Sequence, residues 1–209
     1  MSRAFVIVGT DTNVGKTVFA AALADALGAH YWKPVQSGLE DETDSQTVVR
    51  LAGLTPDRIL PEVWSLPLPA SPHIAARAAG VEIDVAKLTP PQDVSPLVIE
   101  TAGGVMVPLT DHFLSIDLLA RWRLPVIVVA RTALGAINHS LLTLEALRRR
   151  DIVVQGVAFV GDEDAPAQQT IVAMGRVRQL GRLPRLDPLN RETLRAAFAA
   201  NFSAQDFTG

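Results

Sequence analysis

A glycine-rich segment followed by lysine and threonine is the part of the sequence with the clearest chemistry. Residues 9–17 read GTDTNVGKT and lie between a short apolar run and a segment with helical spacing. In such a loop, backbone N–H groups converge on phosphate oxygens, Lys16 reaches the β- and γ-phosphates, and the Thr17 hydroxyl ligates Mg²⁺. Five residues rather than the usual four separate its two glycines, so Thr10 takes the first glycine's place. The segment predicts a nucleotide-binding phosphate loop.

Further polar residues follow other predicted strands. Glu100 ends a buried strand just before the glycine turn at 103–104, where a carboxylate can complete a Mg²⁺ shell with Thr17 and nucleotide phosphates. Lys33 ends another strand and brings a second cation to the same sheet edge. Asp44 follows as a further metal ligand or, alternatively, as the N-cap of a helix.

Strands and helices alternate along the chain and must position these residues. Short apolar runs predict strands at 4–8, 29–33, 96–100, 124–130 and 152–160, and apolar spacing predicts helices at 18–27, 43–51, 74–79 and 137–149. The proline-rich segment 54–72 is expected to be an ordered loop and not a domain boundary. Alternation predicts a single P-loop NTPase-like α/β domain over residues 1–209, with a mostly parallel sheet and helices on both faces. Residues 201–209 are expected to form a flexible tail.

Composition excludes several classes of protein. Of the 209 residues, 48% are apolar and none is cysteine, which excludes a disordered chain, a disulfide framework, a zinc–thiolate site and a thiol nucleophile. The net charge is −3 and the one basic cluster, residues 148–150, ends a predicted helix, so no nucleic-acid partner is expected. The apolar run at 4–8 is too short for a signal peptide or membrane span, which predicts a cytoplasmic protein without a membrane partner.

Five motifs spaced along the chain are more specific than the phosphate loop alone. They are GTDTNVGKT at 9–17, YWKPVQSG at 31–38, SPHI at 71–74, ETAGG at 100–104 with VPL at 107–109, and LGAINH at 134–139. In this order they resemble the dethiobiotin synthetase family. The resemblance implies a ligase of biotin biosynthesis that uses ATP and Mg²⁺ to carboxylate 7,8-diaminopelargonic acid with CO₂ and close the ring to dethiobiotin. The steps it implies pass through a carbamate and a carbamic–phosphoric anhydride.

The resemblance also assigns roles to individual residues. As catalytic groups it implies Lys33 at the carbamate, Lys16 at the γ-phosphate, and the hydroxyls of Thr12 and Ser37 at the carbamate or diamine end. For Mg²⁺ it implies Thr17, Asp44 and Glu100. For the nucleotide it implies Asn13, Val14, Gly15, Lys16, Thr17, Val18, Asp44, Glu100, Gly103, Val160, Gly161, Pro184 and Arg185. For the substrate it implies Thr12, Lys33, Ser37, Gly103 and Asn138, the last supplied by the partner in a homodimer whose substrate spans the interface.

Three positions depart from the family pattern. Thr101 replaces the glycine after the metal-binding glutamate and is expected to crowd the phosphate side of that turn. Asn13 stands where a glutamate is common. Val160 and Gly161 replace Asn-Asp, which removes the side-chain hydrogen bonds that read the adenine edge, so a preference for ATP over other triphosphates is not predicted. The segment 181–185 resembles a second base-flanking segment or, equally, a plain exit from a strand.

A regulatory ATPase of the MinD/ParA kind is the main alternative. Such proteins carry an extra lysine early in the loop, where this chain has Asp11, and residues 201–209 lack a cationic amphipathic helix for a membrane surface. A nucleotide-binding scaffold without turnover would lack the second lysine or the strand-end glutamate, and both are present. His73 and His139 are interpreted as packing or hydrogen-bonding residues rather than acid–base groups.

Overall fold

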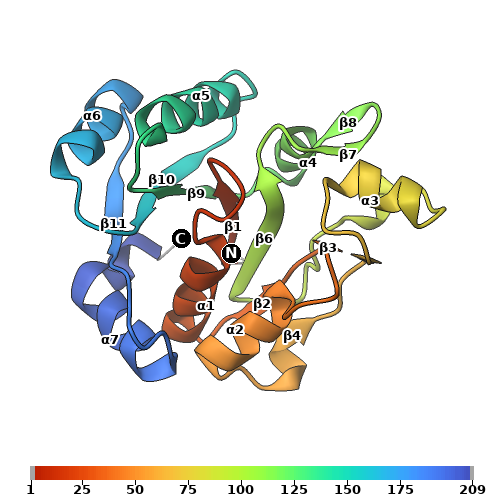
Figure 1. Cartoon of the computed structure of the whole chain (residues 1–209), viewed down its shortest axis with the longest axis horizontal. Helices are drawn as coiled ribbons and strands as arrows, with labels where there is room; N and C mark the ends of the chain where they lie inside the picture. The colour runs from red at the N-terminus through yellow and green to blue at the C-terminus, as the bar shows by residue number, and fades with distance from the viewer. Residues whose placement is uncertain (1–2, 208–209) are drawn as a thin grey trace.

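A computed structural model describes residues 3–207 as one α/β domain built on a parallel sheet (Figure 1). The sheet has seven strands in the order β11-β10-β9-β1-β6-β2-β4, and every neighbouring pair is parallel. The strands are β1 (Ala4–Gly9), β2 (His30–Trp32), β4 (Ile59–Leu60), β6 (Leu97–Gly104), β9 (Val126–Arg131), β10 (Val154–Val160) and β11 (Gln179–Leu183). This arrangement confirms the predicted α/β fold with a mostly parallel sheet.

Helices cover both faces of the sheet because the strands are apolar on both sides. In β1, Phe5 and Ile7 belong to one buried cluster and Val6 and Val8 to another, as the two-residue period of a strand requires. The helices are α1 (Lys16–Leu27), α2 (Asp44–Ala52), α3 (Pro72–Ala78), α4 (Ser115–Trp122), α5 (Ala136–Arg148), α6 (Ala165–Gly175) and α7 (Arg191–Asn201). The first cluster includes side chains of α1, α2 and α7, and the second those of α4, α5 and α6. Figure 1 shows these two groups on opposite sides of the sheet.

The proline-rich segment contains more regular structure than the expected loop. It contains a 3₁₀ turn (Pro56–Arg58), β4 and β5 (Trp64–Leu66). β4 pairs with β2, and β5 pairs with β3 (Val35–Ser37) in a separate two-stranded sheet, because the residues between the prolines retain free N–H groups. A second small sheet, β7 (Pro108–Thr110) with β8 (Phe113–Leu114), and a 3₁₀ turn (Val85–Lys87) complete this region. The loop prediction was therefore wrong for the two short strands.

The described end of the chain packs onto the core. After α7, the 3₁₀ turn Ala204–Phe207 brings Phe207 to within 6.1 Å of Phe5, measured between ring centroids, and Phe202 to Phe19 at 5.5 Å. Residues 201–207 of the expected flexible tail are thus held by aromatic contacts, and residues 208–209 lie outside the described part of the chain. Within residues 3–207, no helix is both long and apolar enough to span a membrane.

Candidate active site

The phosphate loop joins β1 to α1 and is held by close packing around two glycines. A Cβ on Gly9 would lie 2.6 Å from the Asp11 carbonyl oxygen and 2.9 Å from Lys16 Nζ. Gly15 has φ of +93° and forms the N-cap of α1, a left-handed conformation that glycine adopts without steric cost. The Lys16 ammonium donates to the Asp11 carbonyl at 3.1 Å. The loop therefore folds over its own lysine, with the helix N-terminus beneath it.

The pKa of Lys16 is lower than that of an ordinary lysine. Its burial, together with the positive charge of Lys33, lowers its pKa to about 8. Glu100, Asp44 and Asp11 oppose this shift but do not reverse it. A phosphate group brought to this lysine would raise its pKa again, since a nearby opposite charge favours the charged form.

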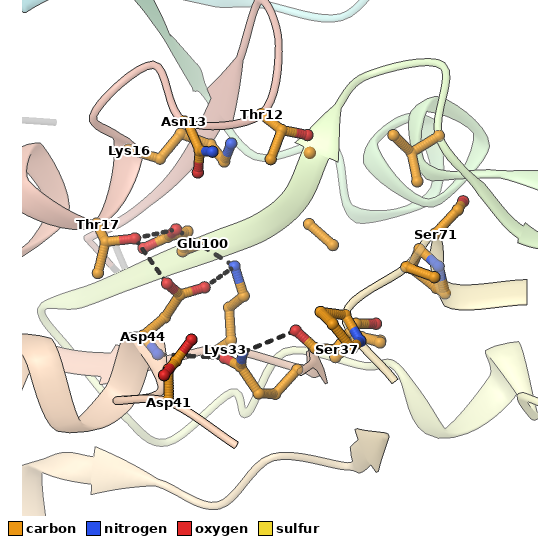
Figure 2. Close-up of a pocket in the computed structure, with 18 of the residues that line it drawn as sticks. Thr12, Asn13, Lys16, Thr17, Lys33, Ser37, Asp41, Asp44, Ser71 and Glu100 are labelled. Atoms are coloured by element: carbon orange, nitrogen blue, oxygen red, sulfur yellow. Dashed lines mark hydrogen bonds and ion pairs between the residues drawn. The ribbon is translucent and has the colours of Figure 1, made fainter. Parts of the chain in front are cut away.

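A hydroxyl and two carboxylates meet at the sheet edge beside the loop (Figure 2). Thr17 Oγ1 lies 2.9 Å from Asp44 Oδ1 and 2.9 Å from Glu100 Oε1. Thr17 belongs to the first turn of α1, Asp44 to the first turn of α2, and Glu100 to β6. The three residues expected to bind Mg²⁺ are therefore brought together from separate segments.

Lys33 points into the same group. Its side chain is buried, and its ammonium lies 2.6 Å from Asp44 Oδ2 and 3.2 Å from Glu100 Oε1. It also donates to the Thr101 carbonyl at 3.2 Å. Burial alone would lower the pKa of Lys33, but the charges of Glu100 and Asp44 outweigh it and raise the pKa above its usual value. The second lysine is thus a cation held at the site.

Asp44 is free to face this site because a neighbour caps the helix. The Thr43 side chain accepts from the Gln46 backbone N–H, and the Gln46 side chain accepts from the Thr43 N–H, which is a capping box. Asp44 follows as the first residue of α2. This excludes the alternative that Asp44 is the N-cap.

These groups open onto a cavity of about 840 Å³ at the carboxyl edge of the sheet. Of the expected site residues, it is lined by Thr12, Asn13, Gly15, Lys16, Thr17, Val18, Lys33, Ser37, Asp44, Glu100 and Gly103. Ser37 Oγ is buried and has no hydrogen-bond partner among the described residues. An orphaned hydroxyl in a cavity wall is a polar group that a ligand can satisfy.

Six expected site residues lie outside this lining: Val14, Asn138, Val160, Gly161, Pro184 and Arg185. Val160 lies beside the loop, since a Cβ on Gly15 would meet Val160 Cγ1 at 2.7 Å. The Gly161 carbonyl accepts from Arg182, and Arg185 forms an exposed ion pair with Asp162. Asn138 is exposed in the first turn of α5.

Thr101 lies within β6, which continues to Gly104, so the expectation that the strand ends at Glu100 before a glycine turn was wrong. The Thr101 side chain is buried, and Oγ1 donates to the Ile7 carbonyl on β1 at 3.2 Å. The expectation of crowding is therefore corrected, because this hydroxyl is used between two strands. Of the two histidines in the motifs, His73 has its Nδ1 within hydrogen-bond distance of Ser71 Oγ, at 3.1 Å, and His139 has its Nδ1 3.9 Å from Asp11 Oδ2.

The donor set fits a hard divalent cation that arrives with a phosphate. Within residues 3–207, no three His, Cys, Asp or Glu side chains are grouped to hold a metal ion on their own. The site offers instead the two carboxylates of Asp44 and Glu100 with the hydroxyl of Thr17. Mg²⁺ is usually held by one or two carboxylates plus substrate phosphates and water. Two carboxylates and a hydroxyl therefore fit Mg²⁺ if phosphates and water supply its other ligands.

Sequence reasoning missed one wall of the cavity. Residues 69–72, together with Gln36 and Asp41, also line it. The Gln36 amide donates to the Ser37 and Gly38 carbonyls, both at 3.2 Å, and so supports the turn after β3. The proline-rich composition was visible in the sequence, but the position of residues 69–72 in the cavity wall depends on tertiary packing that no local pattern predicts.

Comparison with solved structures shows the fold. The domain is similar to the MinD cell division ATPase of Pyrococcus furiosus, with a TM-score of 0.57, 14% identity, and coverage of 94% of this chain and 89% of that one. A ParA family ATPase from Chlorobium tepidum gives a TM-score of 0.51 at 11% identity, over 95% of this chain and 91% of that one. These likenesses confirm a P-loop ATPase fold.

Comparison with protein sequences shows the family. A family model described as an AAA domain matches residues 3–193. The ATP-dependent dethiobiotin synthetase of Agrobacterium fabrum is 62% identical over 99% of this chain and 98% of its own length. The same enzyme of Rhodopseudomonas palustris strain TIE-1 is 61% identical over 100% of this chain and 99% of its own length. The chain therefore belongs to the family of ATP-dependent dethiobiotin synthetases.

Proposed function

We propose that this chain forms dethiobiotin from 7,8-diaminopelargonic acid, CO₂ and ATP through a carbamate. The observation that carries the proposal is the convergence of two buried lysines with Thr17, Asp44 and Glu100 at one cavity. Phosphoryl transfer depends mainly on positioning and on neutralising charge. This group of residues supplies both without a further acid–base residue.

The proposed reaction has three balanced steps. One substrate amine adds to CO₂, forming an N–C bond and releasing a proton, to give a carbamate. A carbamate oxygen attacks the γ-phosphorus of ATP, the bond to the β-phosphate oxygen breaks, and ADP leaves. The second amine attacks the carbonyl carbon of the mixed anhydride, loses a proton and expels phosphate as the urea ring closes.

The lysines and hydroxyls are assigned by their positions in the cavity. Lys33 neutralises the carbamate and then the anhydride, while Lys16 leaves the Asp11 carbonyl to contact the γ-phosphate. Ser37 uses its unpartnered hydroxyl to bind the carbamate or diamine end. Thr12 and Gly103 are neighbours in the cavity wall, since a Cβ on Gly103 would lie 3.5 Å from Thr12 Oγ1. We assign both residues to substrate binding.

We assign Thr17, Asp44 and Glu100 as the residues that hold Mg²⁺. When bound, the ion would neutralise charge on the phosphates of ATP. The Lys33 ammonium pairs with both carboxylates. A divalent cation held by Asp44 and Glu100 would compete with Lys33 for them and would leave the ammonium available to the carbamate.

We assign the remaining nucleotide contacts to the loop and to the ends of β10 and β11. These residues are Asn13, Val14, Gly15, Val18, Val160, Gly161, Pro184 and Arg185. Val160 and Gly161 offer no side-chain amide, and the Gly161 carbonyl is already an acceptor for Arg182. Discrimination of the base is therefore expected to be weak. The use of ATP favours a cytoplasmic location.

We propose a homodimer in which Asn138 reaches the partner's substrate. Asn138 is exposed and lies outside the cavity of its own chain. The helix start that carries it is close to the phosphate loop, as the His139–Asp11 contact shows. The preceding Leu134 is fully exposed, which favours contact with another copy at this end of α5.

One assay tests the proposed activity. Purified protein is incubated with diaminopelargonic acid, bicarbonate, Mg²⁺ and ATP, and dethiobiotin is detected by mass. We expect product with ATP, and no product with any of the four nucleoside triphosphates would reject the assignment. Phosphate release that needs no diamine would point instead to a regulatory ATPase. Size-exclusion chromatography with light scattering tests the dimer.

A further inference from the structure

The buried side chain of Tyr31 contacts Glu100 from the hydrophobic core. Tyr31 is 0% exposed and packs among side chains of the core cluster that includes α1 and α2. Its hydroxyl donates to Glu100 Oε2 at 3.0 Å. A tyrosine hydroxyl is neutral at physiological pH and has one proton to donate. The contact is therefore a hydrogen bond from a neutral donor to a buried acid group.

The pairing of β2 with β6 makes this contact possible. Tyr31 is paired with Val98, and Glu100 lies two residues further along β6. Side chains two apart on a strand share one face, so Val98 and Glu100 project to the same side of the sheet. The hydroxyl must reach roughly 7 Å along the strand direction to meet the carboxylate. A tyrosine spans this distance, whereas a phenylalanine at this position would fill the space without the bond.

The two oxygens of Glu100 have separate partners. Oε1 accepts from Thr17 at 2.9 Å and from Lys33 at 3.2 Å, on the side of the cavity. Oε2 accepts from Tyr31 on the side of the core. Glu100 is 1% exposed, and a buried oxygen left without a donor is costly. One hydrogen bond thus fixes which oxygen faces the core and which faces the cavity.

We infer that Tyr31 is a positioning residue that orients Glu100 so that Oε1 is presented to the divalent cation. This inference rests on the proposed Mg²⁺ site. Groups that hold a metal ligand from behind typically change metal affinity or activity by about 10- to 100-fold when they are removed. Tyr31 acts on the cation through Glu100 and touches no substrate in this assignment.

ADP binding to the full chain tests the inference without relying on turnover. Calorimetry gives the ADP affinity in EDTA and across a series of Mg²⁺ concentrations. Mg²⁺ is expected to increase the ADP affinity, and the midpoint is the Mg²⁺ concentration that gives half of this increase. For Tyr31→Phe we expect the midpoint to rise about tenfold. The ADP affinity in EDTA should stay within about twofold of wild type, because the loop is unchanged. Tyr31→Met, which also lacks the donor, repeats the comparison if the phenylalanine variant does not fold.

Thr101→Val is the matched control. It also removes a buried hydroxyl, next to Glu100 in the chain, but this hydroxyl bonds to the Ile7 carbonyl. A shift in Tyr31→Phe that is absent from Thr101→Val, and that disappears when Glu100→Gln is already present, supports the inference. An unchanged Mg²⁺ midpoint in Tyr31→Phe overturns it, as does an equal shift in the control. If wild type shows no effect of Mg²⁺, the proposed metal site fails and the role of Tyr31 fails with it.

Discussion

The ammonium of Lys33 forms a 2.6 Å ion pair with Asp44, which lies in the first turn of α2. The pair joins Lys33, the residue after β2, to the start of α2. The position of the Lys33 side chain is therefore set by a carboxylate as well as by the strand that precedes it. Its buried charge is balanced within the site, since Glu100 is its second partner. Removing the lysine would leave those carboxylates without a cation.

The substitution Lys33→Gln should abolish turnover and leave nucleotide binding largely intact. The proposed partner of Lys33 is the carbamate, so the lost interaction acts on the reacting centre. We expect kcat to fall about 10³-fold, the upper range for loss of one preorganised group that stabilises charge. Single-turnover kinetics with ADP binding by calorimetry measure the two effects. A parallel loss of ADP affinity would show that Lys33 serves the nucleotide instead.

The substitution Lys16→Ala should weaken nucleotide binding as well as turnover. Lys16 lies in the loop and its ammonium has only to leave the Asp11 carbonyl to reach a phosphate. Loss of such a charged partner costs on the order of 3 kcal/mol, which is about 100-fold in affinity. ADP titration compares this variant with Lys33→Gln. Equal nucleotide affinity in the two variants would contradict the separate roles.

Chelation of divalent cations should stop dethiobiotin formation. The proposed site offers two carboxylates and one hydroxyl to a cation, and nucleotide phosphates and water would supply the remaining ligands of Mg²⁺. We expect activity to return with Mg²⁺ and to recover less with Ca²⁺, which prefers more ligands at longer distances. Product formation is measured in EDTA and after each addition. Full turnover in excess EDTA would contradict the assigned ligands.

The main elements were predictable because their signals are local. The apolar run of β1 and the glycine–lysine loop after it needed no tertiary information. The helices α4, α6 and α7 were not predicted, although Asn190 and Thr193 at the start of α7 form a capping box whose residue types are visible in the sequence. The strands β4 and β5 have only two and three residues. Such short segments between prolines show no periodic pattern that distinguishes a strand from a loop.

Within the site, residue types were predictable but their contacts were not. The sequence marks Thr17 and Asp44 as candidates near helix starts and Glu100 as one on a strand. The bond between Tyr31 and Glu100 depends on the register of β2 against β6. The side chain of Asp44 can face the site because Thr43, and not Asp44, is the N-cap of α2. Such relationships are set by tertiary packing and helix boundaries, which sequence patterns define only loosely.

The substitution Asp25→Asn should reduce stability at neutral pH and not in strong acid. Asp25 on α1 receives two hydrogen bonds from Arg195 on α7, both at 2.6 Å, and these lower its pKa below the usual value. A lowered pKa in the folded state stabilises the protein above the unfolded value of about 3.9, and this contribution is lost as pH falls through the folded pKa.

Urea unfolding from pH 7 to pH 2 measures this difference. The midpoints of wild type and Asp25→Asn should converge as the pH falls. Glu145→Gln is the control, because its exposed partner Arg149 is the C-cap residue of the same helix and the pair joins no second element. A constant difference between wild type and Asp25→Asn at all pH values would mean that the ionised carboxylate is not the source.

The substitution Gly15→Ala should weaken both the fold and nucleotide binding. Gly15 has φ of +93°, and an added Cβ would lie 2.7 Å from Val160 Cγ1, so either β10 or the start of α1 must move. Backbone strain with overpacking costs about 2–4 kcal/mol. Gly80→Ala is the control, since Gly80 has φ of +68° but no atom lies within 4 Å of the added Cβ. Thermal unfolding and ADP titration compare the two variants, and Val160→Ala should recover part of the loss in Gly15→Ala. If Gly15→Ala is no less stable than Gly80→Ala and binds ADP normally, close packing between Val160 and the loop does not set the phosphate site.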